Sequence, residues 1–470
     1  EWNPYDQNAS APFFSPEWMF GMTDGFDVVI GNPPYIQLQA DRSKLARLYA
    51  PCGFDTFKGS GDIYCLFYEK GNYLLKDGGL LCFITSNKWM RAGYGDLLRK
   101  YLTAKTAPTM VIDFGETHVF DAMVMTNILM FKKERNNFGL CATQVKEDFV
   151  NRNAINQYVE AHHIFCHFEG DESWVIMPDE MRALKKKVEA KGVSLEKWKI
   201  DIYRGVLTGF DKAFWITSEE REEILESCET KQEKKLTEAI IKPLLRGKDI
   251  RKYGCQWAEL WLIGTFPSKK IDIKNVPSIR KHLLTFTKER LEQTGKKYIV
   301  NGEEIKSRKK TNGEWFETQD SITYWKKFEG TKIVYPETSK FLPFYYDEGE
   351  FYANKTCFIM TGEHLCYLTA IFNSSLFKYC FRENFPVLFG GARGLSKQFF
   401  EELPIMKVDD KTELEFHDLV QDIQNDFSRE KAKEIDNKIF DLYGLNEHER
   451  QLVGYIDYHD SIENNEKNKN

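Results

Sequence analysis

The chain has 470 residues, of which 42% are hydrophobic, 14% aromatic and 29% charged, and its formal net charge is −6. This length predicts two or three domains with substantial cores, and the composition excludes a disordered, collagenous or disulfide-framed protein. The slightly acidic balance argues against a protein covered in basic charge. Any binding of nucleic acid must therefore depend on how the charge is distributed.

The termini and the cysteines narrow the class of protein further. No apolar run reaches the length of a membrane-spanning helix, and the opening residues Glu1–Pro4 do not resemble a signal peptide, so we expect a cytoplasmic protein. Ten cysteines are spread between Cys52 and Cys380 without a C-x-x-C pair. This spacing favours reduced, mostly buried thiols over disulfides or a zinc ribbon.

The first 135 residues alternate strand-like and helix-like stretches. Apolar runs predict buried strands at 26–30, 79–85, 110–114 and 127–131, and the patterns at 64–75 and 93–102 predict helices. This alternation is typical of a wound α/β sheet. From about residue 176 short aromatic-rich strands and basic loops replace it, and from about 409 a polar helical pattern leads into a charged tail that we expect to fray. We therefore predict domains at 1–175, 176–408 and 409–470.

A Gly-Asn-Pro-Pro-Tyr motif directly follows the first predicted strand, at the carboxyl end where open α/β sheets hold their ligands. The exocyclic amine of adenine is a poor nucleophile because its lone pair is delocalised into the ring. The amide oxygen of Asn32 and the carbonyl of Pro33 would accept its two N–H hydrogens, while Pro34 stiffens the turn and Tyr35 stacks on the base. A base inside a duplex cannot reach such a pocket, so the motif implies base flipping. A plain Pro-Pro turn capped by Asn32 is the alternative.

Three further motifs follow in order: Asp62–Glu69 (Asp-Ile-Tyr-Cys-Leu-Phe-Tyr-Glu), Gly78–Trp89, and Val119–Phe120 before an apolar strand. Together with the Asn-Pro-Pro-Tyr motif they resemble the γ-class amino-methyltransferases, whose simple members are the Taq-type adenine-N6 DNA methyltransferases. The resemblance covers about residues 26–135. It implies a Rossmann-like methyltransferase domain, S-adenosylmethionine as the cofactor, and Phe120 as the aromatic face opposite Tyr35. A core phenylalanine is the alternative for Phe120.

In this family the cofactor site is built mainly by a glycine-rich turn and an acidic residue that precede the Asn-Pro-Pro-Tyr motif. Only 31 residues precede it here, and they contain no glycine-rich strand-to-helix turn. The sequence therefore resembles the C-terminal portion of a type IIG restriction-modification enzyme, whose N-terminal methyltransferase or nuclease portion would supply most of the cofactor site. Phe57–Gly61 has the letters of the missing turn, but the residues before it predict a loop.

Two other clusters have the letters of a catalytic or metal site. Asp179 with Glu189–Lys191 has the residues of a nuclease, but the pattern at 181–188 predicts a helix, which keeps the carboxylates from converging at a strand end. The histidines of His162–His167 would pair on a helix to bind zinc, but on a strand they point to opposite faces, and no fourth-ligand cluster accompanies them. We expect neither a nuclease centre nor a metal site there.

Basic charge gathers in the second half of the chain. Five basic residues between 242 and 252 stand against one acid, and 269–310 holds 13 basic and 5 acidic residues. Segments within about 200–405, among them Ile202–Phe214 and Lys332–Glu337, are similar to the Taq-type specificity domain. The resemblance implies a target-recognition domain that binds double-stranded DNA, and the candidate phosphate contacts are Lys242, Arg246, Lys248, Arg251, Lys252 and Arg393. A solvated charged surface is the alternative.

The residues and the resemblance together predict a site-specific DNA adenine-N6 methyltransferase of a restriction-modification system. Its fold would be an α/β, Rossmann-like methyltransferase domain without its N-terminal part, then an α+β target-recognition domain and a C-terminal helical segment. Two rivals stay open: a non-catalytic DNA-recognition fragment that needs an upstream cofactor-binding half, and a methyltransferase of RNA or of a protein glutamine. The specificity-domain resemblance favours DNA over RNA and protein.

Overall fold

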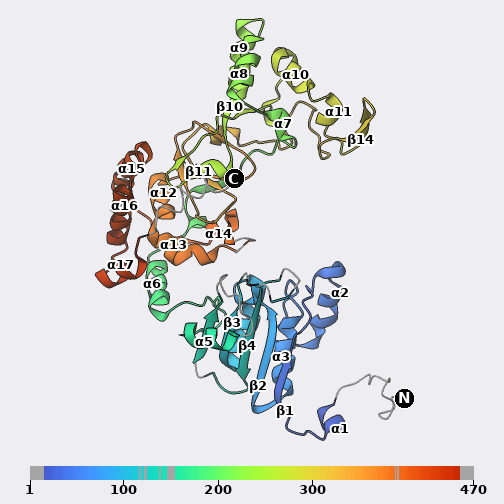
Figure 1. Cartoon of the computed structure of the whole chain (residues 1–470), viewed down its shortest axis with the longest axis vertical. Helices are drawn as coiled ribbons and strands as arrows, with labels where there is room; N and C mark the ends of the chain where they lie inside the picture. The colour runs from blue at the N-terminus through green and yellow to red at the C-terminus, as the bar shows by residue number, and fades with distance from the viewer. Residues whose placement is uncertain are drawn as a thin grey trace. The chain divides into compact units, whose positions relative to one another are not determined.

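The computed structural model describes residues 15–455, except 116, 118, 121–123, 137–138, 146–153, 387 and 389–390. The chain divides into two compact units, Glu1–Ala183 and Leu184–Asn470 (Figure 1). The division falls inside α6 (Asp179–Ala190). All ten cysteines are free thiols. In the part of the chain that is described, no helix combines the length and the apolarity that crossing a membrane requires.

The first unit is built around a six-stranded sheet with the strand order β1-β2-β4-β3-β5-β6. The strands are β1 (Phe26–Gly31), β2 (Leu75–Ser86), β3 (Ala107–Asp113), β4 (Thr126–Lys132), β5 (Leu140–Gln144) and β6 (Ile164–Cys166). β1 pairs with β2 and β3 with β5 in parallel, whereas β4 runs antiparallel to both β2 and β3. The carboxyl ends of β1, β2 and β3 therefore share one edge, which confirms the predicted α/β sheet.

The helices of this part of the chain differ in what they pack against: some share the core of the sheet, whereas α6 buries Leu184 and Val188 in a core of the second unit. The helices are α1 (Pro16–Phe20), α2 (Ala40–Tyr49), α3 (Tyr64–Leu74), α4 (Asp96–Lys105), α5 (Ile155–His162) and α6, with short 3-10 turns at Ala50–Cys52, Asn87–Met90 and Gly93–Gly95. α3 and α4 correspond to the helices predicted at 64–75 and 93–102. Gly71 of α3 lies so close to β2 that a Cβ there would be 2.5 Å from Leu81 Cδ1, so a larger residue at this position would have to displace the Leu81 side chain.

β1 does not match the predicted burial. Val28 and Ile30 are 54% and 78% exposed, whereas Val29 on the opposite face packs against the core. β1 is an outer strand of the sheet, and no described element covers the face that carries Val28 and Ile30. The prediction of a fully buried strand is therefore wrong for β1, because an apolar run does not reveal whether both faces of a strand are covered.

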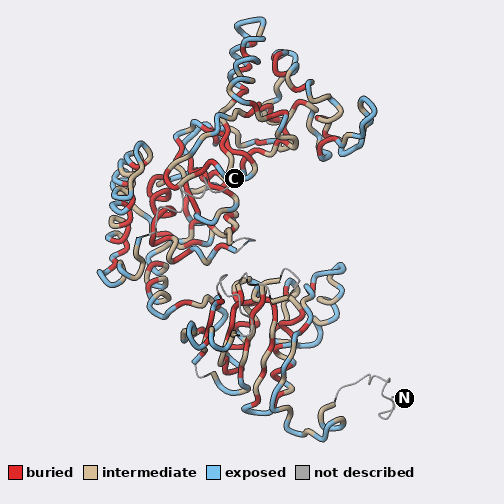
Figure 2. Tube along the Cα trace, viewed as in Figure 1, coloured by how far each residue is buried: buried red, intermediate tan, exposed pale blue. Residues whose placement is uncertain are grey.

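The second unit has two hydrophobic cores on opposite sides of an antiparallel sheet with the order β18-β16-β20-β8. These strands are β18 (Tyr345–Asp347), β16 (Lys332–Pro336), β20 (Cys357–Gly362) and β8 (Ile200–Arg204). Alternate residues of a strand point to opposite faces. On β16, Ile333 and Tyr335 accordingly join one core and Val334 the other; on β20, Met360 and Ile359 divide in the same way. Figure 2 shows this central region as buried. The sheet is thus the shared wall of both cores.

The remaining strands of this unit are short. They are β7 (Val193–Ser194), β9 (Trp215–Ile216), β10 (Ile241–Leu245), β11 (Ile250–Arg251), β12 (Gly254–Cys255), β13 (Trp261–Ile263), β14 (Lys297–Val300), β15 (Glu303–Lys306), β17 (Thr338–Ser339), β19 (Tyr352–Ala353), β21 (Arg393–Gly394) and β22 (Pro404–Ile405). The second four-stranded sheet, β19-β10-β13-β9, packs in the core that contains Val334.

The helices of the second unit enclose both cores. They are α7 (Asp211–Phe214), α8 (Ser218–Glu226), α9 (Lys231–Ile240), α10 (Pro277–Leu284), α11 (Lys288–Leu291), α12 (Leu365–Asn373), α13 (Ser375–Phe381), α14 (Lys397–Glu401), α15 (Asp410–Asn425), α16 (Arg429–Leu442) and α17 (Glu447–Val453). The helical segment expected after 408 begins with Asp409, whose side chain accepts from Thr412 N and caps α15. It shares a core with α12 and α13 through Phe416 and Ile439. The predicted frayed tail, from 456 onward, lies outside the described residues.

Candidate functional site

The Asn-Pro-Pro-Tyr motif follows β1 at the carboxyl edge of the sheet. Asn32 and Pro34 are exposed, and Pro33 is buried. The Tyr35 hydroxyl donates a hydrogen bond of 3.2 Å to the carbonyl of Ile84 near the end of β2. Burial raises the pKa of Tyr35 to about 12, so the hydroxyl stays protonated and able to donate near neutral pH. The turn is therefore fixed to the sheet while the amide of Asn32 faces outward.

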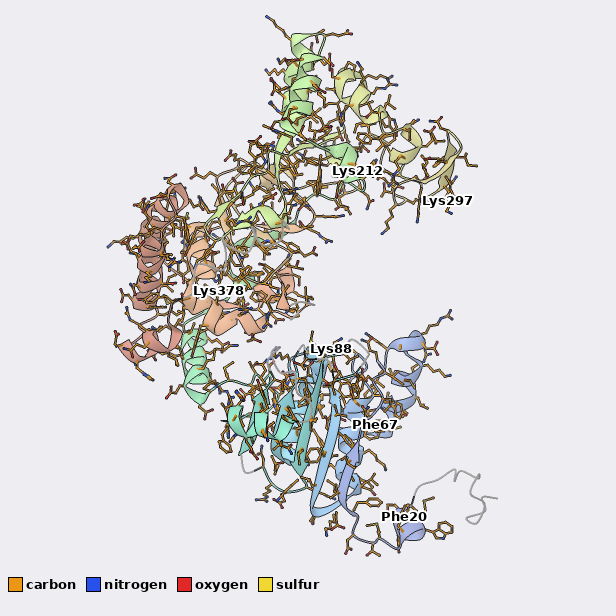
Figure 3. The ribbon with its side chains drawn as sticks, viewed as in Figure 1. Phe20, Phe67, Lys88, Lys212, Lys297 and Lys378 are labelled. Carbon is orange, nitrogen blue, oxygen red and sulfur yellow. The ribbon has the colours of Figure 1, made fainter. Side chains whose placement is uncertain are left out.

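The Asp62–Glu69 motif holds the segment that follows Tyr35. The Asp62 carboxylate accepts from the backbone N–H of Ile36 at 2.8 Å, and Ile63 N donates to the carbonyl of Ile36 at 2.9 Å. Burial raises the pKa of Asp62, and the positive charge of Lys88 opposes that rise. Lys88 lies at the same edge of the sheet (Figure 3). The second motif thus positions the first.

A buried polar network supports this edge from below. The Asn127 side-chain oxygen accepts from the Trp89 indole and from the Thr85 hydroxyl, both at 3.1 Å. Thr85 also bonds to the Tyr68 hydroxyl at 2.8 Å. Because Thr85 follows Ile84 on β2, the network fixes the strand end to which Tyr35 is bonded.

Asp113, at the end of β3, organises two loops at the same edge. One of its carboxylate oxygens accepts from the Asn87 amide at 2.7 Å and from the backbone N–H of Gly115 at 3.0 Å. Phe120 follows in a half-buried bend, with neighbouring positions outside the described residues. Among the described side chains no ring contact joins Phe120 to Tyr35. The aromatic pair around a flipped base therefore stays a prediction.

The glycine-rich match Phe57–Gly61 is the loop that the sequence predicts. It lies in turns, and Lys58 is bound to the Asp96 carboxylate at 2.5 Å and to the Gly93 carbonyl at 2.7 Å. These bonds attach the loop to the start of α4. The residues directly before it, 50–56, form no strand, so the loop is not a strand-to-helix turn.

The nuclease-like residues lie on the helix that the sequence predicts: Asp179 is the first residue of α6 and Glu189 lies on the same helix. The zinc-like histidines lie neither on one helix nor on one strand. His162 is the last residue of α5, His163 caps that helix, and His167 directly follows β6. Within the described residues, no three side chains of His, Cys, Asp or Glu gather as metal ligands.

Three of the predicted DNA contacts are already engaged within the protein. The Lys242 ammonium lies 3.4 Å from the Glu329 carboxylate, and Arg246 makes a two-pronged contact with Asp249 at 2.8 and 3.0 Å. The Arg251 guanidinium donates to the carbonyls of Lys248 and Ile250 and to the Gln256 side chain. Lys248 itself is exposed. Of this basic run, Lys248 is best placed to meet a phosphate.

The structure corrects two of the predicted contacts. Lys252 is 8% exposed, and burial near Lys378 lowers its pKa well below the usual value. Arg393 is also 8% exposed, lies in β21, and binds Glu383 at 2.5 Å and the carbonyl of Phe385 at 3.1 Å. Both cations support the fold in this conformation, because neither presents its charge to solvent where a phosphate would lie.

The specificity-like segments, distant in sequence, meet in the second unit. The Arg204 guanidinium binds the Glu337 carboxylate at 2.9 Å, which joins β8 to the end of β16. Gly205 sits so close to Asn354 that a Cβ would lie 1.9 Å from its carbonyl oxygen. The segments that carry the resemblance therefore form one packed body.

One group of exposed cations was missed when the candidate contacts were chosen from the sequence. The hairpin β14–β15 and its flanks carry five exposed lysines: Lys296, Lys297, Lys306, Lys309 and Lys310. The signal is present in the sequence, because Asn301-Gly302 between two short alternating runs is the usual turn of a tight hairpin. The basic charge of residues 269–310 includes these lysines, but net charge alone does not show that they share one hairpin.

Comparison with known proteins now identifies both units. Residues 3–120 match the family described as Eco57I restriction-modification methylase, and residues 242–405 match the TaqI-like C-terminal specificity domain. The chain therefore combines a segment similar to a restriction-modification methylase with a segment similar to a TaqI-like specificity domain. It is 23% identical over 445 residues to the type II methyltransferase M.PaeR7I of Pseudomonas aeruginosa, covering 91% of the chain and 72% of the relative. It is 24% identical over 460 residues to M.XhoI of Xanthomonas vasicola, covering 92% and 77%.

A shorter and more similar match falls on part of the chain. M.BanIII of Aneurinibacillus aneurinilyticus is 35% identical over 114 residues, which is 23% of this chain and 19% of that relative. Among solved structures, the type IIL restriction-modification enzyme MmeI in complex with DNA aligns with a TM-score of 0.54 at 12% identity. That alignment covers 89% of this chain and 54% of MmeI, so the chain spans about half the length of that solved relative. At this identity the likeness shows the fold.

Proposed function

We propose that this chain supplies the target-adenine pocket and the DNA-reading domain of an adenine-N6 DNA methyltransferase. The observation that carries the proposal is the Asn-Pro-Pro-Tyr turn at the carboxyl edge of the sheet, with Asn32 exposed and Tyr35 bonded to β2. Asn32 Oδ1 and the carbonyl of Pro33 accept the two N–H hydrogens of a flipped adenine, and Tyr35 and Phe120 stack on its faces. Accepting both hydrogens localises the lone pair on the nitrogen, which makes it a better nucleophile.

S-adenosylmethionine is the proposed methyl donor, on the strength of the family. The described residues do not form a complete site for it: Phe57–Gly61 lies in turns, and its Lys58 is held by Asp96. We therefore assign the cofactor site to a further part of the enzyme, as in a type IIG protein, and derive no methyl-transfer step from this chain alone. The open edge of β1, with Val28 and Ile30 exposed, suits pairing with that part.

Double-stranded DNA is the proposed substrate. The match to a TaqI-like specificity domain supports it, as does the likeness to an enzyme solved in complex with DNA. We retain Lys248 as a phosphate contact, with Lys242, Arg246 and Arg251 as cations that would have to leave their present partners first. The bacterial sources of the relatives support a place in the bacterial cytoplasm.

The test is transfer of a labelled methyl group from S-adenosylmethionine to unmethylated bacterial DNA, followed by digestion to nucleosides and mass spectrometry. With the cofactor-binding portion present we expect label in N6-methyladenine, and Asn32→Ala should lower transfer by at least about 100-fold, the range typical of losing one group that acts on the transition state. Asn156→Ala, an exposed asparagine on α5, is the matched control and should leave transfer unchanged. Binding of DNA should persist in both variants.

The rivals give different results in the same assay. If the chain binds DNA but transfers no methyl group until an upstream cofactor-binding portion is added, the fragment hypothesis is supported. Label in RNA or in a protein glutamine, with none in DNA, contradicts the proposed substrate. Undiminished transfer to DNA by Asn32→Ala contradicts the pocket assignment.

A further inference from the structure

The β14–β15 ribbon is a separate two-stranded hairpin of the second unit, and Figure 1 shows it beyond α11 at an outer part of that unit. Its turn is Asn301-Gly302, with φ values of 52° and 84° that fit the left-handed conformations of a tight hairpin turn. The register pairs Tyr298 with Ile305 and Ile299 with Glu304. The two faces of the ribbon can therefore be assigned residue by residue.

The two faces differ in burial. Tyr298, Val300 and Ile305 lie on one face and are half-buried. The other face consists of Lys297, Ile299, Glu304 and Lys306, all of which are exposed. Ile299 is 81% exposed, whereas the apolar residues on the opposite face of the ribbon are half-buried. A single exposed isoleucine is ordinary by itself, so it is the charge around Ile299 that marks this face as a binding surface.

Within the described part of the chain, most of the lysine charge on the ribbon and its flanks lacks a carboxylate partner, and Lys297 is the exception. Lys297 and Lys306 are directly opposite each other across the two strands, and like charges at such positions lower stability by themselves. Lys297 is paired with Glu304 at 2.7 Å. Among the residues that the structure describes, no carboxylate pairs with the ammonium groups of Lys296, Lys306, Lys309 or Lys310. These groups are free to meet an anion, and Figure 3 shows Lys297 on the same arm of the unit.

A rigid base carries the ribbon. The side chain of Arg308 is buried, at 2% exposure, and donates to the carbonyls of Leu291, Thr208, Glu317 and Trp315 at 2.7 to 2.8 Å. Arg308 O in turn accepts from Gly295 N, so both ends of the hairpin are tied to the unit. The ribbon is thus presented at a fixed place with its exposed face outward.

We propose that the β14–β15 ribbon enters the major groove of the target DNA, with its lysines on the flanking phosphates and Ile299 against the base edges. This inference rests on the proposed function, because it takes DNA as the substrate. The major groove of B-DNA, about 12 Å wide, admits a two-stranded ribbon, whereas the minor groove is about 6 Å wide. An apolar side chain at such a place contacts the methyl group of thymine, and lysines on phosphates fix the register.

The test begins with a pool of duplexes of randomised sequence, from which the wild-type chain selects its preferred site. Affinity for that site is then measured by fluorescence anisotropy over a range of salt. The ribbon variant K296Q/K306Q/K309Q/K310Q is compared with K199Q/K397Q/K411Q/K433Q, which removes the same charge from exposed positions of the same unit. The slope of log affinity against log salt should become shallower by about 2 to 4 in the ribbon variant alone, since each phosphate contact contributes about 0.9.

Reading of bases is tested at the tip of the ribbon. Ile299→Ala should relax the sequence preference at one or two positions of the selected site, and Leu414→Ala, an equally aliphatic residue that is 63% exposed on α15, should not. Equal salt slopes in the two quadruple variants, with an unchanged site for Ile299→Ala, would overturn the ribbon inference alone. If the wild-type chain selects no duplex at all, the result contradicts the proposed function itself. This outcome differs from the one that overturns only the ribbon inference.

Discussion

The buried ion pair between β16 and β18 yields a prediction whose size follows from the structure. Lys332 and Asp347 are directly opposite in the register, and their side chains are 0% and 1% exposed. The Lys332 ammonium also donates to the carbonyl of Phe328 at 2.6 Å, and the Asp347 carboxylate accepts from the backbone N–H groups of Glu350 and Phe351 at 3.1 and 3.2 Å. Burial lowers the pKa of Lys332 and the carboxylate opposes that shift.

Removing one partner leaves the other charge buried without compensation, so Asp347→Asn and Lys332→Met should each lower the free energy of unfolding by about 3 to 5 kcal/mol. The double variant K332M/D347N has no uncompensated charge, and the Asn side-chain oxygen still accepts from one of the two N–H groups. Its loss should fall short of the sum of the single losses by at least about 2 kcal/mol.

Hydrogen–deuterium exchange of the β16 and β18 peptides reports on the second unit by itself. Losses that simply add would refute the reasoning, because additivity means that the two side chains do not act as a pair.

Two further changes test other buried groups. Asn127→Leu removes the acceptor of two buried donors and should lower the free energy of unfolding by about 2 kcal/mol. Thr143→Val is the control, because it removes a buried hydroxyl that has no partner among the described residues, and it should leave the stability unchanged. Urea unfolding measures both variants, and equal losses would contradict the role of the polar network. Burial lowers the pKa of Lys378 from 10.5 to about 8, so between these pH values the unfolded chain binds more protons than the folded one. The stability of the wild type should therefore rise with pH relative to Lys378→Met, by up to about 3 kcal/mol between pH 8 and 10.5, and parallel pH profiles would rule this out.

The catalytic half of the sequence was the more predictable. Strands such as 79–85 and 127–131 are apolar runs buried in the sheet, and the turn after β1 is set by two prolines whose backbone geometry is restricted. The exposure of Ile30 could not be predicted, because the number of covered faces of a strand depends on elements distant in the sequence. The sequence indicates Asp62 only as part of a motif, because its hydrogen bond to Ile36 forms only when the two segments pair.

Charge was the least predictable property of the site. Lys252 and Lys248 are four residues apart in one basic run, yet one is buried and the other exposed. Net charge over a window does not distinguish a cation that holds the fold together from one that faces solvent. The hairpin turn at Asn301-Gly302 was the better guide, since it specifies which neighbouring side chains share a face.

The uncovered side of β1 also governs how the chain behaves at high concentration. A strand at the edge of a sheet has unpaired N–H and C=O groups, and an apolar face beside them makes it a template for any extended segment, including one from another copy. The unpaired backbone groups and exposed apolar side chains of β1 would allow a partner strand to bind, and they would equally allow two copies of the chain to aggregate through β1. Its solubility should depend on whether the edge is covered.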